Sequence, residues 1–177
     1  MNEKNNNVLA IVPGSRYFGI AVFLGMDLRE WGIKVVKGKI PQSVVGKYVE
    51  KYNIDVLTIK KLHPSRTSER LDQVVKSLKQ YARTHGISLY EYSITEIETA
   101  VLPPGKRNKQ VLMEKTAAGY PFLWIDVERE KKNKNPYLFR MFEAVGLGIK
   151  CLQNLDLKKG GLEKYFKENR GKTLDGL

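Results

Sequence analysis

The sequence predicts an α/β domain in which helices flank a sheet of mixed strand direction. Three strand-like segments open the chain, two more alternate with helical patterns, and helical patterns fill most of the remaining residues. Strands that alternate with helices are typical of layered α/β folds. Because domains average roughly 150 residues, we expect the 177 residues to form a single domain. Residues 1–7 and about 155–177 are expected to be its flexible or peripheral ends.

Apolar runs and turn signals define the first three strands. Residues 8–12 form a continuous apolar run that stops at a Pro-Gly-Ser turn signal, as expected of a strand buried on both faces. A second strand fits residues 18–24, and a Gly-Met-Asp sequence then offers a hairpin turn into a third strand at about 28–36. The chain is therefore expected to open with three consecutive strands.

Helices and strands alternate in the middle of the chain. The predicted helices span 41–52 and 65–83, and the predicted strands span 55–59 and 88–92. The second of these helices carries apolar residues at helical spacing: Leu71, Val74, Val75, Leu78 and Ala82. Ser93 and Glu96 form a capping-box pattern, which predicts another helix directly after the last strand.

Three further segments complete the chain. Asn108 is placed to cap a helix that runs to about Ala118, and residues 136–152 repeat apolar side chains at helical spacing. Between them, residues 122–127 fit either a strand or part of an irregular loop. From Asn154 the sequence is rich in Lys and Gly, so we expect the end of this tail to be mobile.

Basic side chains exceed acidic ones along the whole chain. Lys and Arg total 31 against 19 Asp and Glu, which gives a net charge of +12 and a pI near 9.7. Residues 103–177 hold 16 basic and 9 acidic side chains, so the positive density rises toward the C-terminus. Two clusters are prominent: Lys106, Arg107, Lys109 and Lys115, and then Arg129, Lys131, Lys132 and Lys134. Each cation alone is an ordinary solvated charge, whereas their sum favours nucleic acid as the partner.

The sequence predicts neither export nor membrane insertion. No apolar stretch approaches the roughly 20 residues that a membrane-spanning helix requires, and no basic segment with a long apolar one precedes the first strand. The one cysteine, Cys151, cannot build an intrachain disulfide framework. We therefore expect a cytoplasmic, intracellular protein with no membrane partner.

Patterns that mark acyl-transfer and nucleotide-binding enzymes are missing. The sequence has no Gly-x-Ser-x-Gly motif, and no Lys-Ser/Thr pair completes a phosphate-binding P-loop. His63 and His85 are isolated from Cys, His and carboxylates at metal-binding spacing, so we expect both on the surface.

Two pairs of glycines have structural explanations. Gly14 and Gly19 are explained by conformational freedom in the first turn and by close approach of strands. Gly146 and Gly148 lie inside a helical pattern, which favours tight helix–sheet packing over a dinucleotide-binding fingerprint.

A family resemblance begins in the first hairpin. Residues 8–23, VLAIVPGSRYFGIAVF, resemble the first hairpin of the RuvC-like Holliday-junction resolvases and, more broadly, of the RNase H-like nucleases. In that family the first strand ends in Asp-Pro-Gly, followed by a small residue, a basic residue and a later Gly. Segments that resemble later parts of the family, in the same order, are 54–62, 89–99, 105–116 and 140–149. The resemblance spans roughly residues 8–152 and implies an RNase H-like fold with a mixed five-stranded sheet flanked by helices.

The resemblance also implies a nuclease in which four carboxylates hold two Mg²⁺ or Mn²⁺ ions around a scissile phosphate. Two cations about 4 Å apart stabilise the attacking and leaving oxygens only where anionic oxygens hold them. Carried over residue by residue, the four acid positions fall on Val12, Lys60, Arg140 and Glu143, of which only Glu143 is acidic. Val12 offers no ligand, and Lys60 places a cation where the charge of a metal would lie. A shift by one position meets Lys61, which is also basic.

The sequence therefore identifies no catalytic residue and predicts no metal or other cofactor. Mg²⁺ or Mn²⁺ enters only under the alternative of an active enzyme whose rearranged site uses Glu143 and other acids. The candidates for that role, each expected to be a surface carboxylate, are Asp27, Asp55, Glu69 and Glu91. Glu143 lies off the centre of the apolar stripe of its helix, so we expect an ordinary exposed residue there. The alternative hypothesis is an ion pair with Lys60 that replaces the metal cluster.

The function that the sequence favours is that of a catalytically inactive, RuvC-like protein, a pseudo-resolvase that binds DNA or another structured nucleic acid. Six basic side chains are candidates for contacting phosphates: Arg16, Lys60, Lys61, Lys106, Arg107 and Lys109. Basic side chains on a solvated surface that binds no nucleic acid would have the same sequence pattern. Tyr17, Trp31 and Tyr120 are expected to be packing residues rather than base-stacking ones. The alternatives are an active metal-dependent, structure-specific endonuclease and a protein–protein assembly module, and a homodimer stays open.

Overall fold

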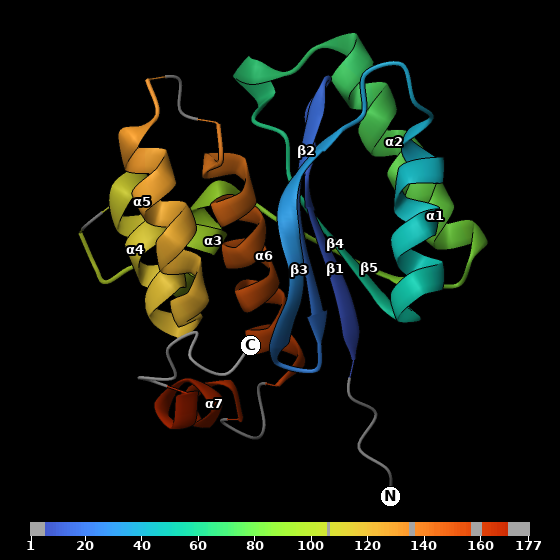
Figure 1. Ribbon diagram of the computed structural model, residues 1–177. Coiled ribbons are helices and arrows are strands. Elements are labelled where there is room, and N and C mark those ends of the chain that lie inside the picture. The colour runs from blue at the N-terminus through green and yellow to red at the C-terminus, as the bar shows by residue number, and fades with distance from the viewer. Residues whose placement is uncertain (1–5, 106, 135–136, 157–160, 170–177) are drawn as a thin grey trace, which may run out of the picture.

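The computed structural model describes residues 6–105, 107–134, 137–156 and 161–169, and a five-stranded mixed sheet forms its centre (Figure 1). The strands are β1 (Asn7–Val12), β2 (Tyr17–Leu24), β3 (Asp27–Val35), β4 (Val56–Lys60) and β5 (Ser88–Tyr92). Their order across the sheet is β3-β2-β1-β4-β5, with β2 antiparallel to both neighbours and β4 parallel to β1 and β5. The predicted α/β class and mixed sheet are confirmed.

Helices cover both faces of this sheet (Figure 1). On one face lie α1 (Pro41–Tyr52) and α2 (Glu69–Thr84), and on the other lies α6 (Phe139–Leu155). The helices α3 (Ile94–Val101) and α4 (Lys109–Gly119) pack against α6, and α5 (Trp124–Lys132) packs against α4. A last helix, α7, spans Gly161–Asn169. Among the helices of the described residues, none is both long and apolar enough to span a bilayer.

Burial on both faces explains the continuous apolar run of β1. Leu9 and Ile11 belong to the core under α1 and α2, whereas Val8, Ala10 and Val12 belong to the core under α6. Successive side chains of a strand point to opposite faces of the sheet. A strand between two helical layers therefore needs an apolar residue at every position.

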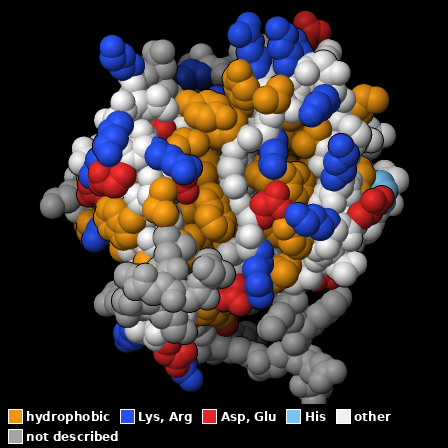
Figure 2. Space-filling model, viewed as in Figure 1, with side chains coloured by type: hydrophobic (Ala, Val, Ile, Leu, Met, Phe, Trp, Pro, Cys, Tyr) orange, Lys and Arg blue, Asp and Glu red, His pale blue; other side chains and the backbone are white. Residues whose placement is uncertain are grey.

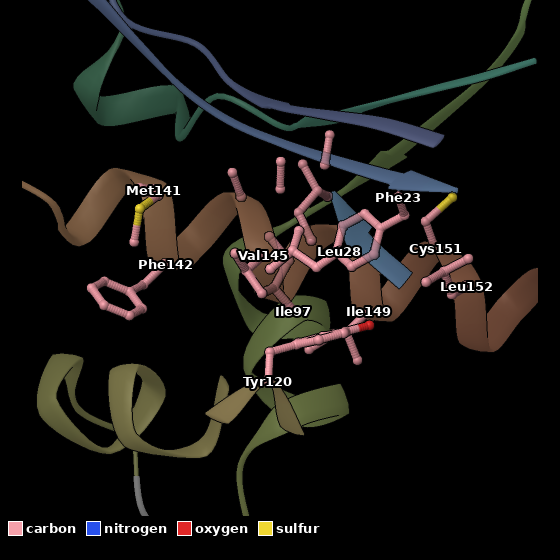
Figure 3. Packing of buried hydrophobic residues seen from close by; sticks show 14 of the residues in the cluster. Phe23, Leu28, Ile97, Tyr120, Met141, Phe142, Val145, Ile149, Cys151 and Leu152 are labelled. Carbon is pink, nitrogen blue, oxygen red and sulfur yellow. The ribbon is translucent and has the colours of Figure 1, made fainter. Parts of the chain in front are cut away.

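Helix α6 is buried along most of its length (Figure 3). The sheet lies on one side of it, and α3 and α4 lie on the other. Gly148 faces Phe23 on β2, where a Cβ would overlap the phenyl ring, and Gly146 faces Ile97 on α3. The predicted tight helix–sheet packing is thus confirmed at Gly148, whereas Gly146 serves the packing of one helix on another.

The region 122–127 is helical, so its prediction as a strand or an irregular loop is wrong. A 3-10 turn spans Pro121–Leu123 and leads directly into α5. Leu123, Val127 and Glu130 are buried at helical spacing, so one side of this short helix covers the core.

Local caps determine where three other helices start. The capping box between Ser93 and Glu96 is present at the start of α3, and Asn108 accepts a hydrogen bond from the N–H of Val111 at 2.8 Å. Both predicted caps are confirmed. Helix α2 starts at Glu69 rather than at residue 65, because Ser68 caps it and the preceding residues form a separate 3-10 turn. His63 and His85 are exposed, as predicted.

The helix α7 is an element that the sequence did not predict. Leu162 is buried in it, and the N–H of Leu162 donates a hydrogen bond to Asp156 at 3.1 Å. The hydroxyl of Tyr165 donates to Asp27 on β3 at 2.8 Å. The remaining expectations for the two chain ends fall on residues 1–5, 157–160 and 170–177, which lie outside the described residues.

Candidate nucleic-acid interface

The predicted site lies where β1 and β4 end, a region called here the β1–β4 end of the sheet. These strands are parallel, so their last residues, Val12 and Lys60, lie on adjacent strands at the same end. β2 starts at this end with Tyr17, whose carbonyl accepts a hydrogen bond from Arg140 on α6. Glu143, one turn further along α6, reaches Lys60. The structure therefore brings together the four positions where the resemblance implies acidic residues.

Lys60 and Glu143 form an ion pair in which Nζ of Lys60 donates a hydrogen bond to Oε2 of Glu143. The side chain of Glu143 is 9% exposed and that of Lys60 is 23% exposed, so the pair is largely withdrawn from water. The ion pair proposed as a hypothesis from the sequence is confirmed. The expectation that Glu143 is exposed is wrong, because α6 is covered both by the sheet and by α3 and α4.

Arg140 fills the space between α6 and the first hairpin. Its Nη1 donates to the carbonyl of Tyr17 at 2.8 Å, and a Cβ at Gly14 would overlap its guanidinium group. A Cβ at Gly19 would overlap the backbone of Arg140. Neither glycine has a positive φ, so the predicted need for conformational freedom in this turn is wrong. Both glycines instead allow α6 and the Arg140 side chain to approach the hairpin closely.

These side chains do not fit a two-metal centre. Val12 has no oxygen in its side chain, and Lys60 and Arg140 are positively charged at two of the positions where the resemblance implies metal ligands. The carboxylate of Glu143 already accepts a hydrogen bond from Lys60. Across the described ranges, no group of three or more His, Cys, Asp or Glu side chains is placed to hold a metal ion.

The acids considered as replacement ligands lie elsewhere. Asp27 starts β3 and Asp55 precedes β4, so both lie at the end of the sheet opposite to the site. Glu91 pairs with Lys79 at 2.9 Å, and Glu69 is exposed in the first turn of α2. The structure does not gather these carboxylates into one site.

Exposed cations lie on chain segments next to the β1–β4 end of the sheet. Five of them are called the basic rim: Arg16, Lys37, Lys61, Arg107 and Lys109. Within the part of the chain that the structure describes, no ion pair neutralises any of the five. Figure 2 shows Lys and Arg side chains along the upper side of the molecule, next to exposed hydrophobic side chains.

Backbone and ring contacts position the rim. The carbonyl of Arg16 accepts a hydrogen bond from the N–H of Lys37 at 3.3 Å, which joins the first turn to the end of β3. Nζ of Lys109 lies 5.0 Å from the ring centroid of Phe139, which brings the start of α4 to the first turn of α6. Lys37 is a rim residue that sequence reasoning missed, although it directly follows the third strand predicted at about 28–36. The predicted Lys106 lies outside the described residues.

The aromatic side chains singled out from the sequence differ in exposure. Trp31 donates a hydrogen bond to Asp126 at 3.0 Å and Tyr120 is 1% exposed, so the predicted packing roles of both are confirmed. Tyr17 is 40% exposed, so its predicted packing role stays a prediction. Tyr137, which sequence reasoning did not single out, lies edge-on against Tyr17 with 6.1 Å between ring centroids.

Known structures with the same arrangement of elements include junction resolvases. The chain is similar to T. thermophilus RuvC in complex with a Holliday junction substrate, with a TM-score of 0.62 and 12% identity, covering 85% of this chain and 95% of that one. Another Thermus thermophilus RuvC structure has a TM-score of 0.61 and 13% identity, covering 84% of this chain and 95% of that one. The structure of Fowlpox virus resolvase in complex with Holliday junction DNA has a TM-score of 0.54 and 13% identity, covering 84% of this chain and 98% of that one. No family model and no curated protein sequence matches the chain. The chain therefore has the RNase H-like α/β fold of RuvC, as the resemblance implied.

Proposed function

We propose that this protein binds nucleic acid at the β1–β4 end of its sheet and does not cleave it. The observation that carries the proposal is the Lys60–Glu143 ion pair, which lies where the resemblance implies metal ligands. Two of the structures that share the fold are resolvases in complex with Holliday junction DNA or substrate. A net charge of +12 favours a polyanionic partner as well.

The electrostatics of the ion pair support binding without cleavage. Two-metal hydrolysis of a phosphodiester requires hard anionic oxygens around both cations. At the four family positions the site offers one carboxylate, and Lys60 neutralises it. Arg140 adds a further positive charge that is anchored to the carbonyl of Tyr17. Such a site attracts a phosphate and repels a divalent cation.

The basic rim supports an electrostatic mode of binding with weak sequence preference. Arg16, Lys61 and Lys109 come from the first hairpin, the end of β4 and the start of α4. A phosphate backbone that crosses this end of the sheet would meet a cation from each of these elements. Contacts to phosphates fix position and orientation but do not read bases.

Fluorescence anisotropy with four-way-junction, duplex and single-stranded DNA probes tests the binding. The rim variant carries Arg16→Gln, Lys61→Gln and Lys109→Gln, and its affinity is expected to fall about tenfold or more for every probe at low salt. A matched control removes three exposed charges outside the rim through Arg29→Gln, Arg83→Gln and Lys115→Gln. Its affinity is expected to stay within about threefold of the wild type. If the wild type binds no probe even at low salt, the proposal fails and a protein–protein assembly module is favoured.

A second experiment tests whether the protein cleaves nucleic acid. The same probes are incubated with the protein and Mg²⁺ or Mn²⁺ and then analysed by denaturing electrophoresis. We expect no cleavage product from any probe. Metal-dependent cleavage that copurifies with the protein and disappears in Glu143→Gln would contradict the proposal and favour an active endonuclease with a rearranged site.

A further inference from the structure

We propose that Tyr17 and Tyr137 form a stacking surface for an unpaired base of the bound nucleic acid. The inference rests on the proposed function and narrows the ligand to nucleic acid that contains unpaired or splayed bases. Tyr17 starts β2, and Tyr137 lies just before α6. Two segments that are far apart in the sequence therefore build this surface.

The two rings touch each other and are still exposed. Tyr17 is 40% exposed and Tyr137 is 50% exposed, and their ring planes are 89° apart. An edge-to-face contact covers only part of the ring faces, so aromatic surface stays open to solvent. Val35, which is paired with Tyr17 across β2 and β3 and is 51% exposed, extends the apolar area. Because every base has a π-face, such a surface accepts an unpaired base of any sequence.

Arg140 fixes the position of the pair. Its guanidinium group donates to the carbonyl of Tyr17, and Arg140 itself follows Tyr137 in the first turn of α6. One side chain thus ties together the two segments that carry the rings. The absence of a Cβ at Gly14 and Gly19 makes room for it. A surface that is already ordered loses less conformational freedom on binding, so Arg140 acts as a positioning residue.

The charges beside the rings favour a nucleic acid over an apolar peptide as the occupant. Arg16 directly precedes Tyr17, and Lys37 is hydrogen-bonded to the backbone of Arg16. The acid nearest to Arg140 along α6, Glu143, is already paired with Lys60. A backbone whose phosphates contact Arg16 and Lys37 passes next to the two rings, which places its bases within reach of them.

The experiment compares two DNA probes that differ in one base. One is a duplex of about 20 base pairs with a single bulged 2-aminopurine, and the other is the same duplex fully paired. We expect the wild type to bind the bulged probe more tightly and to quench its 2-aminopurine fluorescence. In the double variant Tyr17→Leu, Tyr137→Leu, affinity for the bulged probe is expected to fall about tenfold and the quench to disappear, since stacking on an aromatic side chain is lost. Affinity for the paired probe is expected to stay within about twofold.

Two controls accompany this comparison. Trp124→Leu removes from α5 an aromatic side chain that is 40% exposed, as Tyr17 is. This variant is expected to bind the bulged and the paired probe as tightly as the wild type does. The double variant Tyr17→Phe, Tyr137→Phe keeps both rings and is expected to retain the preference for the bulge. Circular dichroism spectra and melting temperatures show whether each variant is folded.

The outcomes separate this inference from the proposed function. If the wild type binds both probes equally and the leucine variant binds as the wild type does, the stacking inference fails and the proposed function stands. A leucine variant that loses affinity equally for both probes, although folded, also contradicts stacking. If the wild type binds neither probe, the proposed function fails, and the stacking inference fails with it.

Discussion

The ammonium group of Lys60 does for Glu143 what a metal ion does for a buried carboxylate: it supplies the opposite charge that makes burial tolerable. The two residues lie 83 positions apart in the sequence. Strand ends and the family resemblance predicted that they come close. The sequence did not predict the burial of Glu143, because that depends on how closely α6 packs against the end of β4, where Lys60 lies.

Removal of Lys60 alone is expected to cost more stability than removal of both partners. Lys60→Met leaves the Glu143 carboxylate buried and unpaired, so the free energy of unfolding should fall by roughly 2–3 kcal/mol. The double variant Lys60→Met, Glu143→Leu leaves no buried charge and should recover more than half of that loss. Urea unfolding followed by circular dichroism measures both values. Equal losses in the single and double variants would contradict this expectation, because an unpaired Glu143 carboxylate would then cost no stability.

The thiol of Cys151 is predicted to be unreactive in the folded protein. Burial raises the pKa of this thiol to about 12, and only the thiolate is a nucleophile. At pH 8, dithiobis(nitrobenzoate) should label the native protein slowly and the urea-unfolded protein completely. The folded state disfavours the thiolate, so this group stabilises the protein fully below pH 9 and loses that effect as the pH rises from about 9 to about 12. Rapid labelling of native protein would disprove the assignment of Cys151 to the core.

Among the helices and strands, several that carry caps or regularly spaced apolar residues were predicted from the sequence. The bounds of α1 and β5 agree with those predicted, and caps at Ser93 and Asn108 fixed two helix starts. Helix α5 was missed because its exposed Trp124 and Ile125 lengthen a short apolar run so that it resembles a strand. Helix α7 was missed because it depends on tertiary contacts, such as the hydrogen bond from Tyr165 to Asp27.

The same substitution is expected to have opposite effects in two helices. Gly148→Ala on α6 places a Cβ in the ring of Phe23 and should lower the free energy of unfolding by roughly 1–3 kcal/mol through overpacking. At Gly46 on α1 a Cβ meets its nearest neighbour, the hydroxyl of Tyr81, at 3.4 Å. Gly46→Ala should therefore raise the free energy of unfolding by about 0.5–1 kcal/mol through helix propensity. Thermal and urea unfolding measure both, and destabilisation of equal size at the two positions would contradict the packing described for α6.

At the scale of the whole molecule, the alternation of helices and strands was sufficient to predict the layers and the mixed sheet. The net charge predicted a polyanionic partner but not the surface that binds it, because a net charge does not show where the charges lie in space. The structure shows that Arg16, Lys37 and Lys61 come to one end of the sheet from three separate segments. Tyr137 was not predictable as their neighbour, because it is placed by the packing of α6 against the first hairpin.

The salt dependence of four-way-junction binding shows whether the basic rim binds nucleic acid through its charges. Each phosphate that a rim cation neutralises releases counterions, so log K against log[salt] should fall with a slope of roughly −0.9 per contact. The wild type is expected to show a steep slope. The rim variant Arg16→Gln, Lys61→Gln, Lys109→Gln should flatten that slope by about 2 to 3, while the control variant Arg29→Gln, Arg83→Gln, Lys115→Gln should keep the slope of the wild type. A wild-type slope near zero, or equal slopes for the wild type and the rim variant, would contradict the claim that the basic rim binds nucleic acid.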